Sequence, residues 1–364
     1  MIDSAKTEYT PQQVSPPGDT LAETLEELGM SQTELARRMG RPTKTINEIV
    51  QGKTAILPET AIQLENVLGI TASFWLARET AYRTSIARSI RQTEVVAPDT
   101  LEWAKQFPCK EMATLGWIAS CAKKADYAQG LFEFFRVASV QAWEATWNRP
   151  EVAFRRSLTK EGNQHAVAAW LRQGEIEAAT QKTRPYDASA FRDALRFCRT
   201  LTAADPKTFR PAVQKACGDA GVVVLFVHEL PSAGVSGAAR WLSAHRALIQ
   251  LTLRFKTDDQ LWFSFFHEAA HVLLHPKKGI FVDNGQGTSS QEKEADAFAS
   301  NMLIPDEAFA SFASVRPFSA QRVRAFAAKE AIAPGIVVGR LQHERLLPFN
   351  QLIHLKRRFH WVNQ

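Results

Sequence analysis

Along the first 84 residues, apolar positions recur every three or four residues within short stretches separated by glycine and proline. This spacing predicts amphipathic helices, and the glycines and prolines predict where they end. Ser31 and Thr43 are expected helix caps, with Glu34 at the capping-box spacing from Ser31. Residues 1–17 are polar and contain prolines, which predicts a disordered tail. We expect helices at residues 20–28, 31–39, 43–50, 58–68 and 73–84.

From residue 98 to 218 the pattern stays helical, and aromatic stripes such as GLFEFFRVASVQAW are typical of core packing. The pattern changes at Gly221, where VVVLFV, ARWLS and HRALIQLTL predict three strands with a hairpin turn near Ala244. The alternating tail LIHLKRRFHW predicts an edge strand. Later helices are expected at residues 258–275, 290–303, 319–329 and 336–343. The chain is therefore expected to be mainly helical with a small β-sheet, an α+β fold.

Composition places this chain of 364 residues, 45% of them hydrophobic, among water-soluble globular proteins with two or three domains. It contains no apolar run near the roughly 18 residues that span a bilayer, and its start lacks a signal-peptide pattern. Four scattered cysteines are typical of reduced thiols and disfavour a cysteine-ligated metal. We therefore expect a cytoplasmic protein without membrane contact. The net charge of +6 permits nucleic-acid binding but does not indicate it alone.

The most specific chemical motif is the run HEAAH, which lies within the apolar stretch LWFSFFHEAAHVLLH. Its helical spacing puts His267 and His271 one turn apart on one face, where both imidazoles can reach one metal ion. Glu268 is rotated about 100° around the axis, beside the ion, where it can take a proton from metal-bound water. Burying three such polar residues without partners would be costly, which disfavours a purely structural role. The run predicts a Zn²⁺ site of hydrolytic type.

A carboxylate in SSQEKEADAFASNML is expected to be the third ligand. Glu292 shares the inward face with Asp296, whereas Glu294 is rotated about 200° from Glu292 and points mostly to solvent. We therefore expect Glu292 to bind the metal, with Glu294 as the alternative. Asp296, one turn beyond Glu292, is expected to hydrogen-bond the ring of a ligating histidine.

His275 repeats the four-residue spacing but lies about 12 Å along the axis from His267, so one ion cannot bind both. We interpret it as a C-terminal residue favoured by the helix dipole. Two histidines and one carboxylate leave a fourth position for water, whose pKa zinc lowers towards about 7. Glu268 would act as the general base when this water attacks a peptide carbonyl. His343 is a candidate for supporting the transition state.

Residues 31–50 fit a helix-turn-helix, in which apolar side chains such as Leu35 and Ile46 join two short helices and Gly40 permits the turn. The second helix of such a module enters the major groove of double-stranded DNA. A plain helical bundle is the alternative interpretation. Candidate DNA contacts are Gln32, Thr43, Lys44, Thr45, Asn47, Glu48 and Lys53. Because these modules read two half-sites, we expect a homodimer on an operator.

Two parts of the sequence resemble known protein families at these motifs. Residues 17–82, with MSQTELARRMGRPTKTINEIVQGK and ILPETAIQLENVLG, resemble the Cro/C1-type helix-turn-helix in its HigA/VapI antitoxin branch. That resemblance implies a five-helix λ-repressor-like domain. Residues 219–347, with FFHEAAHVLLH, EKEADAFASNMLIP and GIVVGRLQHE, resemble the ImmA/IrrE metallopeptidase family. This implies a gluzincin-like fold with zinc held by His267, His271 and Glu292 and with Glu268 as base. Members of that family typically cleave a partner repressor in stress, mobile-element or defence circuits.

These inferences divide the chain into a tail at 1–17, a DNA-binding domain at 18–84, a linker at 85–97, a helical middle region at 98–218 and a metallopeptidase domain at 219–364. The first functional hypothesis is a DNA-binding regulator with a zinc endopeptidase site that cleaves a repressor, a toxin or itself. The alternative is a HigA-like antitoxin or repressor whose peptidase-like domain is a sensor with little or no proteolysis. The intact HEAAH run and the downstream glutamate favour the first.

Overall fold

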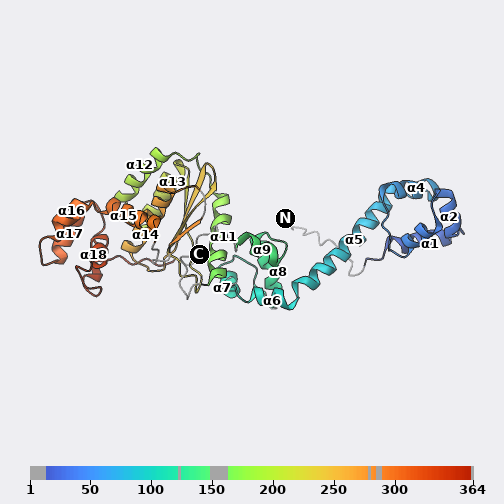
Figure 1. The fold of residues 1–364 in the computed structure, drawn as a ribbon, viewed down its shortest axis with the longest axis horizontal. Coiled ribbons are helices and arrows are strands. Elements are labelled where there is room, and N and C mark those ends of the chain that lie inside the picture. The colour runs from blue at the N-terminus through green and yellow to red at the C-terminus, as the bar shows by residue number, and fades with distance from the viewer. Residues whose placement is uncertain (1–13, 122–123, 148–162, 278–279, 284–288, 362–364) are drawn as a thin grey trace, which may run out of the picture. The chain divides into compact units, whose positions relative to one another are not determined.

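The computed structural model describes residues 14–121, 124–147, 163–277, 280–283 and 289–361 (Figure 1). The chain divides into two compact units, Met1–Ala97 and Pro98–Gln364. The disordered tail expected at residues 1–17 falls mainly on residues 1–13, which lie outside the described part. The expected mainly helical fold class with a small sheet is confirmed.

The first unit contains the five predicted helices in its described residues. They are α1 (Pro17–Glu27), α2 (Gln32–Met39), α3 (Thr43–Val50), α4 (Pro58–Leu68) and α5 (Ala72–Val95). The Ser31 hydroxyl accepts a hydrogen bond from the Glu34 amide at 3.1 Å, so the predicted cap of α2 is confirmed. Gly40 ends α2 with a φ of 64°, a conformation that glycine adopts without strain.

Two details of the first unit differ from the sequence predictions. Thr43 was expected to cap α3, but it is the first helical residue, because the extended Pro42 occupies the cap position. Residues 85–97 were expected to form a linker, and most of them are the second half of α5, which ends at Val95. No glycine or proline interrupts the sequence between residues 72 and 96, so the helix has no local reason to stop earlier.

The core of the first unit is built from apolar side chains that all five helices contribute. Leu21, Leu35, Ile46, Leu64 and Trp75 are each fully buried. Gly18 lets the start of α1 approach the end of α3, because a Cβ on Gly18 would lie 2.2 Å from the carbonyl oxygen of Val50. The backbone contact between these two helices therefore depends on the missing side chain.

The second unit places a mixed sheet between helices. Before the sheet come α6 (Pro98–Ala104), α7 (Cys109–Thr114), α8 (Lys124–Phe135), α9 (Val140–Trp147), α11 (Gln164–Thr180), α12 (Ala188–Thr200) and α13 (Pro206–Asp219). The described strands are β1 (Val222–Phe226), β2 (Gly237–Ser243), β3 (Arg246–Leu251) and β4 (Ile280–Asp283), in the order β1-β3-β2-β4. After β3 the helices are α14 (Asp258–Leu274), α15 (Ser290–Leu303), α16 (Asp306–Ala313), α17 (Ala320–Lys329) and α18 (Pro334–His343).

Helices cover both faces of this sheet (Figure 1). On one face, Ile249 of β3 and Ala239 of β2 join a core that includes Phe265 and Phe266 of α14. On the other face, polar side chains attach α11. The Gln250 amide donates to the carbonyl of Trp170 at 2.6 Å, and Arg240 forms an ion pair with Glu175 at 2.8 Å. The sheet therefore holds α14 against one side and α11 against the other.

The C-terminal tail is not the predicted edge strand. Residues 353–355 form a short 3₁₀ helix (Ile353–Leu355), and the tail makes an isolated bridge between Arg358 and Thr257. Leu352 has a φ of 55°, which interrupts an extended strand. The basic residues of the tail instead contact the start of α14, where the Lys356 ammonium lies 2.6 Å from Asp259 Oδ2.

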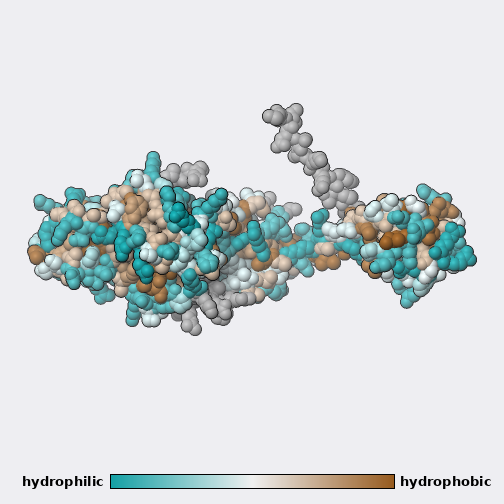
Figure 2. Space-filling model, turned by 90° about the horizontal axis from the view of Figure 1, so that it is seen from above, coloured by the Kyte–Doolittle hydropathy of each residue, from teal (hydrophilic) through white to brown (hydrophobic). Residues whose placement is uncertain are grey.

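The surface visible in Figure 2 is mixed, with hydrophobic residues scattered among hydrophilic ones. Among the described residues, no helix combines the length and the apolar character needed to cross a membrane.

Candidate metal centre and DNA-reading helices

Helix α14 carries the HEAAH run through the interior of the second unit. His267, Glu268 and His271 are each at most 2% exposed. Asp258 and Asp259 occupy the first turn, where negative charge stabilises a helix through its dipole. Burial, reinforced by the neighbouring Asp259, raises the pKa of Asp258 to about 6. The helix ends at Leu274 because the next residue is extended and Pro276 cannot continue it.

Three side chains converge as a metal site requires. His267 Nε2 lies 3.1 Å from His271 Nε2 and 3.1 Å from Glu292 Oε2, and His271 Nε2 lies 3.7 Å from Glu292 Oε1. Four ligands around a tetrahedral Zn²⁺ at bond lengths of about 2.0–2.1 Å would be roughly 3.3 Å apart. The donor set of two imidazoles and one carboxylate therefore fits Zn²⁺ in both chemistry and spacing.

His271 is ready to act as a ligand because its ring is neutral. Burial, together with the adjacent His267 and His275, lowers the pKa of His271 to about 2. A neutral imidazole keeps a lone pair on one nitrogen, which is what a metal ion binds.

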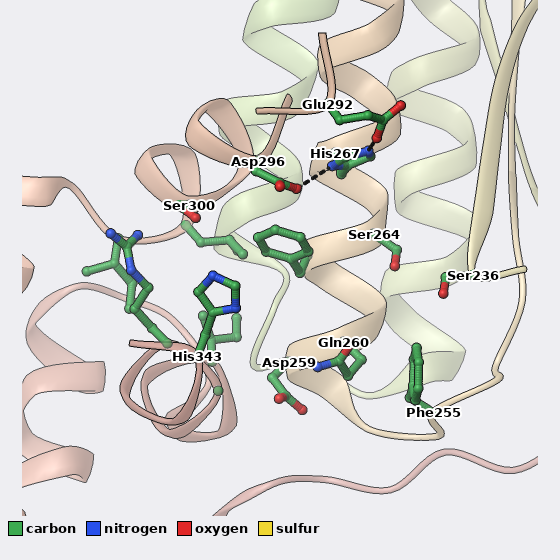
Figure 3. Close-up of a pocket in the computed structure, with 16 residues that line it drawn as sticks. Ser236, Phe255, Asp259, Gln260, Ser264, His267, Glu292, Asp296, Ser300 and His343 are labelled. Carbon is green, nitrogen blue, oxygen red and sulfur yellow. Dashed lines mark hydrogen bonds and ion pairs between the residues drawn. The ribbon is translucent and has the colours of Figure 1, made fainter. Parts of the chain in front are cut away.

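The other acidic residues of α15 have different neighbours. Asp296 Oδ1 lies 2.9 Å from Nδ1 of His267, which is the placement that we expected for Asp296 (Figure 3). Glu294, the alternative ligand, is instead 3.3 Å from Nε2 of His275. It therefore lies outside the group of converging ligand atoms.

His275 makes a contact that its interpretation as a dipole-favoured residue missed. Its side chain is 3% exposed, and its Nδ1 lies 2.8 Å from Nδ1 of His271. The signal was present in the sequence, because four-residue spacing puts His271 and His275 on one face.

Glu268 lies beside the sheet. Its side chain is wholly buried and packs against Gly237 of β2, where a Cβ on the glycine would come within 2.7 Å of Glu268 Oε1. Gly237 thus leaves the space that this carboxylate fills.

A cavity of about 300 Å³ adjoins the converging ligands. His267, Glu292 and Asp296 line it from α14 and α15, and Arg340 and His343 line it from α18. In Figure 3, His343 lies on a different wall from the His267–Glu292 pair. Glu268 and His271 are not among the residues that line the cavity as the structure describes it.

In the first unit, α3 carries five of the seven predicted DNA-contacting residues. Ile46 and Ile49 are buried against α1 and α2, which leaves Thr43, Lys44 and Asn47 exposed on the opposite face. Lys53 is exposed just beyond the helix, and Thr45 is half-buried.

Some of these side chains are tied to neighbours within the unit. The Asn47 amide donates to Gln32 of α2 at 3.4 Å, which links the two helices at their exposed edge. Glu48 accepts a hydrogen bond from Thr54 at 3.3 Å and faces Lys44 at 3.9 Å. A negatively charged Glu48 on this face would restrict which DNA groups can approach it.

Comparisons with known proteins match both regions. Residues 21–75 match the helix-turn-helix family, and residues 217–328 match the IrrE N-terminal-like domain. An uncharacterized HTH-type transcriptional regulator, YddM of Escherichia coli (strain K12), is 37% identical over 79 residues, which are 22% of this chain and 82% of that protein. Virulence-associated protein A of Dichelobacter nodosus is 42% identical over 62 residues, 17% of this chain and 61% of that protein.

Solved structures similar to the chain include antitoxins. A HigA-family addiction module antidote protein from Coxiella burnetii is 32% identical and covers 24% of this chain and 97% of its own, with a TM-score of 0.22. The Pseudomonas aeruginosa antitoxin HigA, solved with the higBA promoter, is 27% identical and covers 24% of this chain and 98% of its own, also with a TM-score of 0.22.

Proposed function

Because the chain belongs to the family of helix-turn-helix transcriptional regulators and carries an IrrE N-terminal-like domain, we propose that it is a DNA-binding regulator with a zinc endopeptidase site. We assign DNA binding to residues 18–84 and the peptidase chemistry to residues 219–364. The observation that carries the proposal is the convergence of His267, His271 and Glu292 within 4.8 Å beside a cavity. Its substrate is a peptide bond in a protein partner: a repressor, a toxin or the chain itself.

Each residue of the site then has a defined task. His267 and His271 present Nε2 lone pairs, and Glu292 presents a carboxylate oxygen. Asp296 accepts the proton on His267 Nδ1, which fixes the ring with Nε2 free to bind. A bound Zn²⁺ supplies Lewis acidity that polarises a peptide carbonyl and activates water.

Glu268 acts as the general base and acid in this proposal. Its carboxylate takes a proton from the attacking water and delivers it to the leaving amine. Burial against Gly237 keeps bulk solvent away from this carboxylate, which limits competing proton exchange. His343, on another wall of the cavity, is our candidate donor to the oxygen that becomes negative during the reaction.

The position of Glu268 also supports the alternative function. Its carboxylate packs on β2 and does not line the cavity, so the described arrangement does not present it to a molecule in that space. In the alternative, the second unit is a sensor or interaction module of a HigA-like repressor, with little or no proteolysis. Hydrolysis by the isolated protein would decide in favour of the peptidase.

Metal content tests the site directly. We expect about one Zn²⁺ per wild-type chain and a loss of affinity of at least about a hundredfold in His267→Ala, because one ligand is removed. Elemental analysis after dialysis against a weak chelator measures both. His343→Ala is the matched control, since that imidazole lines the cavity without joining the ligand group, and it should keep its zinc. Zinc-free wild-type protein, or equal zinc in His267→Ala, would contradict the site.

The proposed DNA-binding domain is tested by measuring its affinity for DNA. Lys44 is exposed on α3, and Lys44→Ala should weaken binding to duplex DNA selected by the wild-type protein by roughly tenfold at low salt. The control is Lys110→Ala, which removes an equal charge from the exposed surface of α7. Fluorescence anisotropy at several salt concentrations measures the affinity and its salt dependence. Equal binding by both variants would remove α3 as the reading helix. We further propose that the operator has two half-sites and binds a homodimer in the cytoplasm.

A further inference from the structure

A second pair of side chains, outside the ligand group, lies directly behind His271. His275 Nδ1 is 2.8 Å from His271 Nδ1, and His275 Nε2 is 3.3 Å from Glu294 Oε2. The His275 side chain is 3% exposed, whereas that of Glu294 is 59% exposed. A continuous path therefore runs from the surface carboxylate through two rings to the proposed metal position.

The path is held in place by the elements around it. His275 is the extended residue that follows α14, and its backbone amide donates to the carbonyl of His271 at 3.3 Å. Phe281 of β4 stacks on the His271 ring at 4.3 Å and lies 5.5 Å from the His275 ring. Lys277, two residues on, is fixed by the Ala244 carbonyl at 3.1 Å and by the Trp241 ring at 4.2 Å. Burial and the neighbouring Phe281 ring limit the freedom of the His275 ring to turn away.

The positions of the protons follow from this geometry. Metal binding needs a lone pair on His271 Nε2, so the proton of that neutral ring sits on Nδ1 and must be donated. His275 Nδ1 is the acceptor at 2.8 Å, which places the proton of His275 on Nε2. That N–H points to the Glu294 carboxylate. One assignment of donors and acceptors satisfies all three side chains.

We infer that His275 and Glu294 are positioning residues for His271: they fix its tautomer and ring orientation so that Nε2 faces the metal. The inference rests on the proposed metal site. Asp296 acts on His267 in the same way, at 2.9 Å from its Nδ1. The three acidic residues of α15 thus have different roles. Glu292 binds the metal, Asp296 orients His267 directly, and Glu294 orients His271 through His275.

The test is the dissociation constant of Zn²⁺, measured by competition with a chromogenic chelator. His275→Phe keeps an aromatic ring beside Phe281 but removes the acceptor, and we expect about 10- to 100-fold weaker zinc binding. His275→Asn offers an amide oxygen near the position of Nδ1, and it should restore most of the lost affinity. A ring that merely filled space would show the opposite order, with phenylalanine the better replacement.

Glu294 supplies a variant that does not disturb the core. Glu294→Ala removes a largely exposed side chain and should weaken zinc binding by about three- to tenfold in the wild-type background. In the His275→Phe background it should change the dissociation constant less than about twofold, because the path is already broken. Glu307→Ala, which removes an exposed carboxylate at the start of α16, is the matched control and should leave affinity unchanged.

A second measurement reports the protons directly. In zinc-bound protein, ¹⁵N NMR of the imidazoles should show His271 protonated at Nδ1 and His275 at Nε2, and Glu294→Ala should reduce the preference at His275. This inference alone is overturned if the wild-type protein binds zinc through His267 but the Zn²⁺ dissociation constants of His275→Phe and Glu294→Ala both stay within about twofold of the wild-type value. Wild-type protein without zinc overturns the proposed function and this inference together.

Discussion

Glu268→Gln should retain its zinc and lose at least about a hundredfold in peptide hydrolysis, the lower end of what a general base contributes. Glutamine has nearly the same shape as glutamate, but its amide cannot accept the proton that the attacking water gives up. Zinc should remain because Glu268 is not among the converging ligands. Cleavage of a quenched-fluorescence peptide library gives the rate, and elemental analysis gives the metal content.

A second substitution moves the same carboxylate without changing it. A Cβ at Gly237 would lie 2.7 Å from Glu268 Oε1 and 3.1 Å from its Cδ, so Gly237→Ala must shift the carboxylate. We expect Gly237→Ala to keep zinc and lose at least about tenfold in rate, since misplacement costs catalysis. Glu307→Gln makes the same chemical change at an exposed position and should leave the rate unchanged. Wild-type rates in Glu268→Gln would show that another group is the base, or that the cleavage has another source.

The ligand group could be placed from sequence because local helix geometry determines it. His267 and His271 are one turn apart on α14, and the face of α15 that carries Ala295 also carries Glu292 and Asp296. Helices were predicted at residues 258–275 and 290–303, and α14 and α15 are Asp258–Leu274 and Ser290–Leu303. The spacing also indicated that Glu292, rather than Glu294, lies beside His267 and His271, and this is the arrangement in the structure.

The partners of these residues from elsewhere in the chain could not be placed in this way. Phe281, which stacks on His271, belongs to the four-residue strand β4, too short to give a clear alternating pattern. The basic tail alternates like a strand, but Lys356 is held by Asp259, 97 positions earlier in the chain. A periodicity describes one element and carries no information about such distant partners. For the same reason, the packing of Gly237 against Glu268 could not be predicted from the sequence pattern.

Gly18→Ala gives the largest effect that we expect on stability, and its sign opposes helix propensity. Gly18 lies in the first turn of α1, and alanine in a helix is normally more stable than glycine by up to about 1 kcal/mol. Here the new Cβ would lie 2.2 Å from the Val50 oxygen, 2.4 Å from the Ile49 oxygen and 2.6 Å from the Val50 carbonyl carbon. All three are backbone atoms at the end of α3, so no side chain can rotate to make room.

The helices must therefore separate, which uncovers Leu21, Ile46 and Ile49 between α1 and α3. We expect about 3 kcal/mol of destabilisation in the first unit, the upper range for an overpacked core. Hydrogen exchange of residues 17–95 in the full chain, followed by mass spectrometry, measures this loss. Gly69→Ala is the matched control: its φ of 73° strains alanine, but a Cβ there meets no atom within 4 Å, so it should cost only about 1 kcal/mol.

Gly18→Ala should affect the function of the first unit and leave that of the second unit unchanged. Because α3 carries the proposed DNA contacts and ends at Val50, its displacement in Gly18→Ala should weaken DNA binding by more than the roughly tenfold loss expected for Lys44→Ala. Zinc content and hydrolysis should be unchanged, since all their residues belong to the second compact unit. If Gly18→Ala were as stable as wild type, the close approach of α1 to α3 would be wrong. If it lost zinc as well, the units would not be independent.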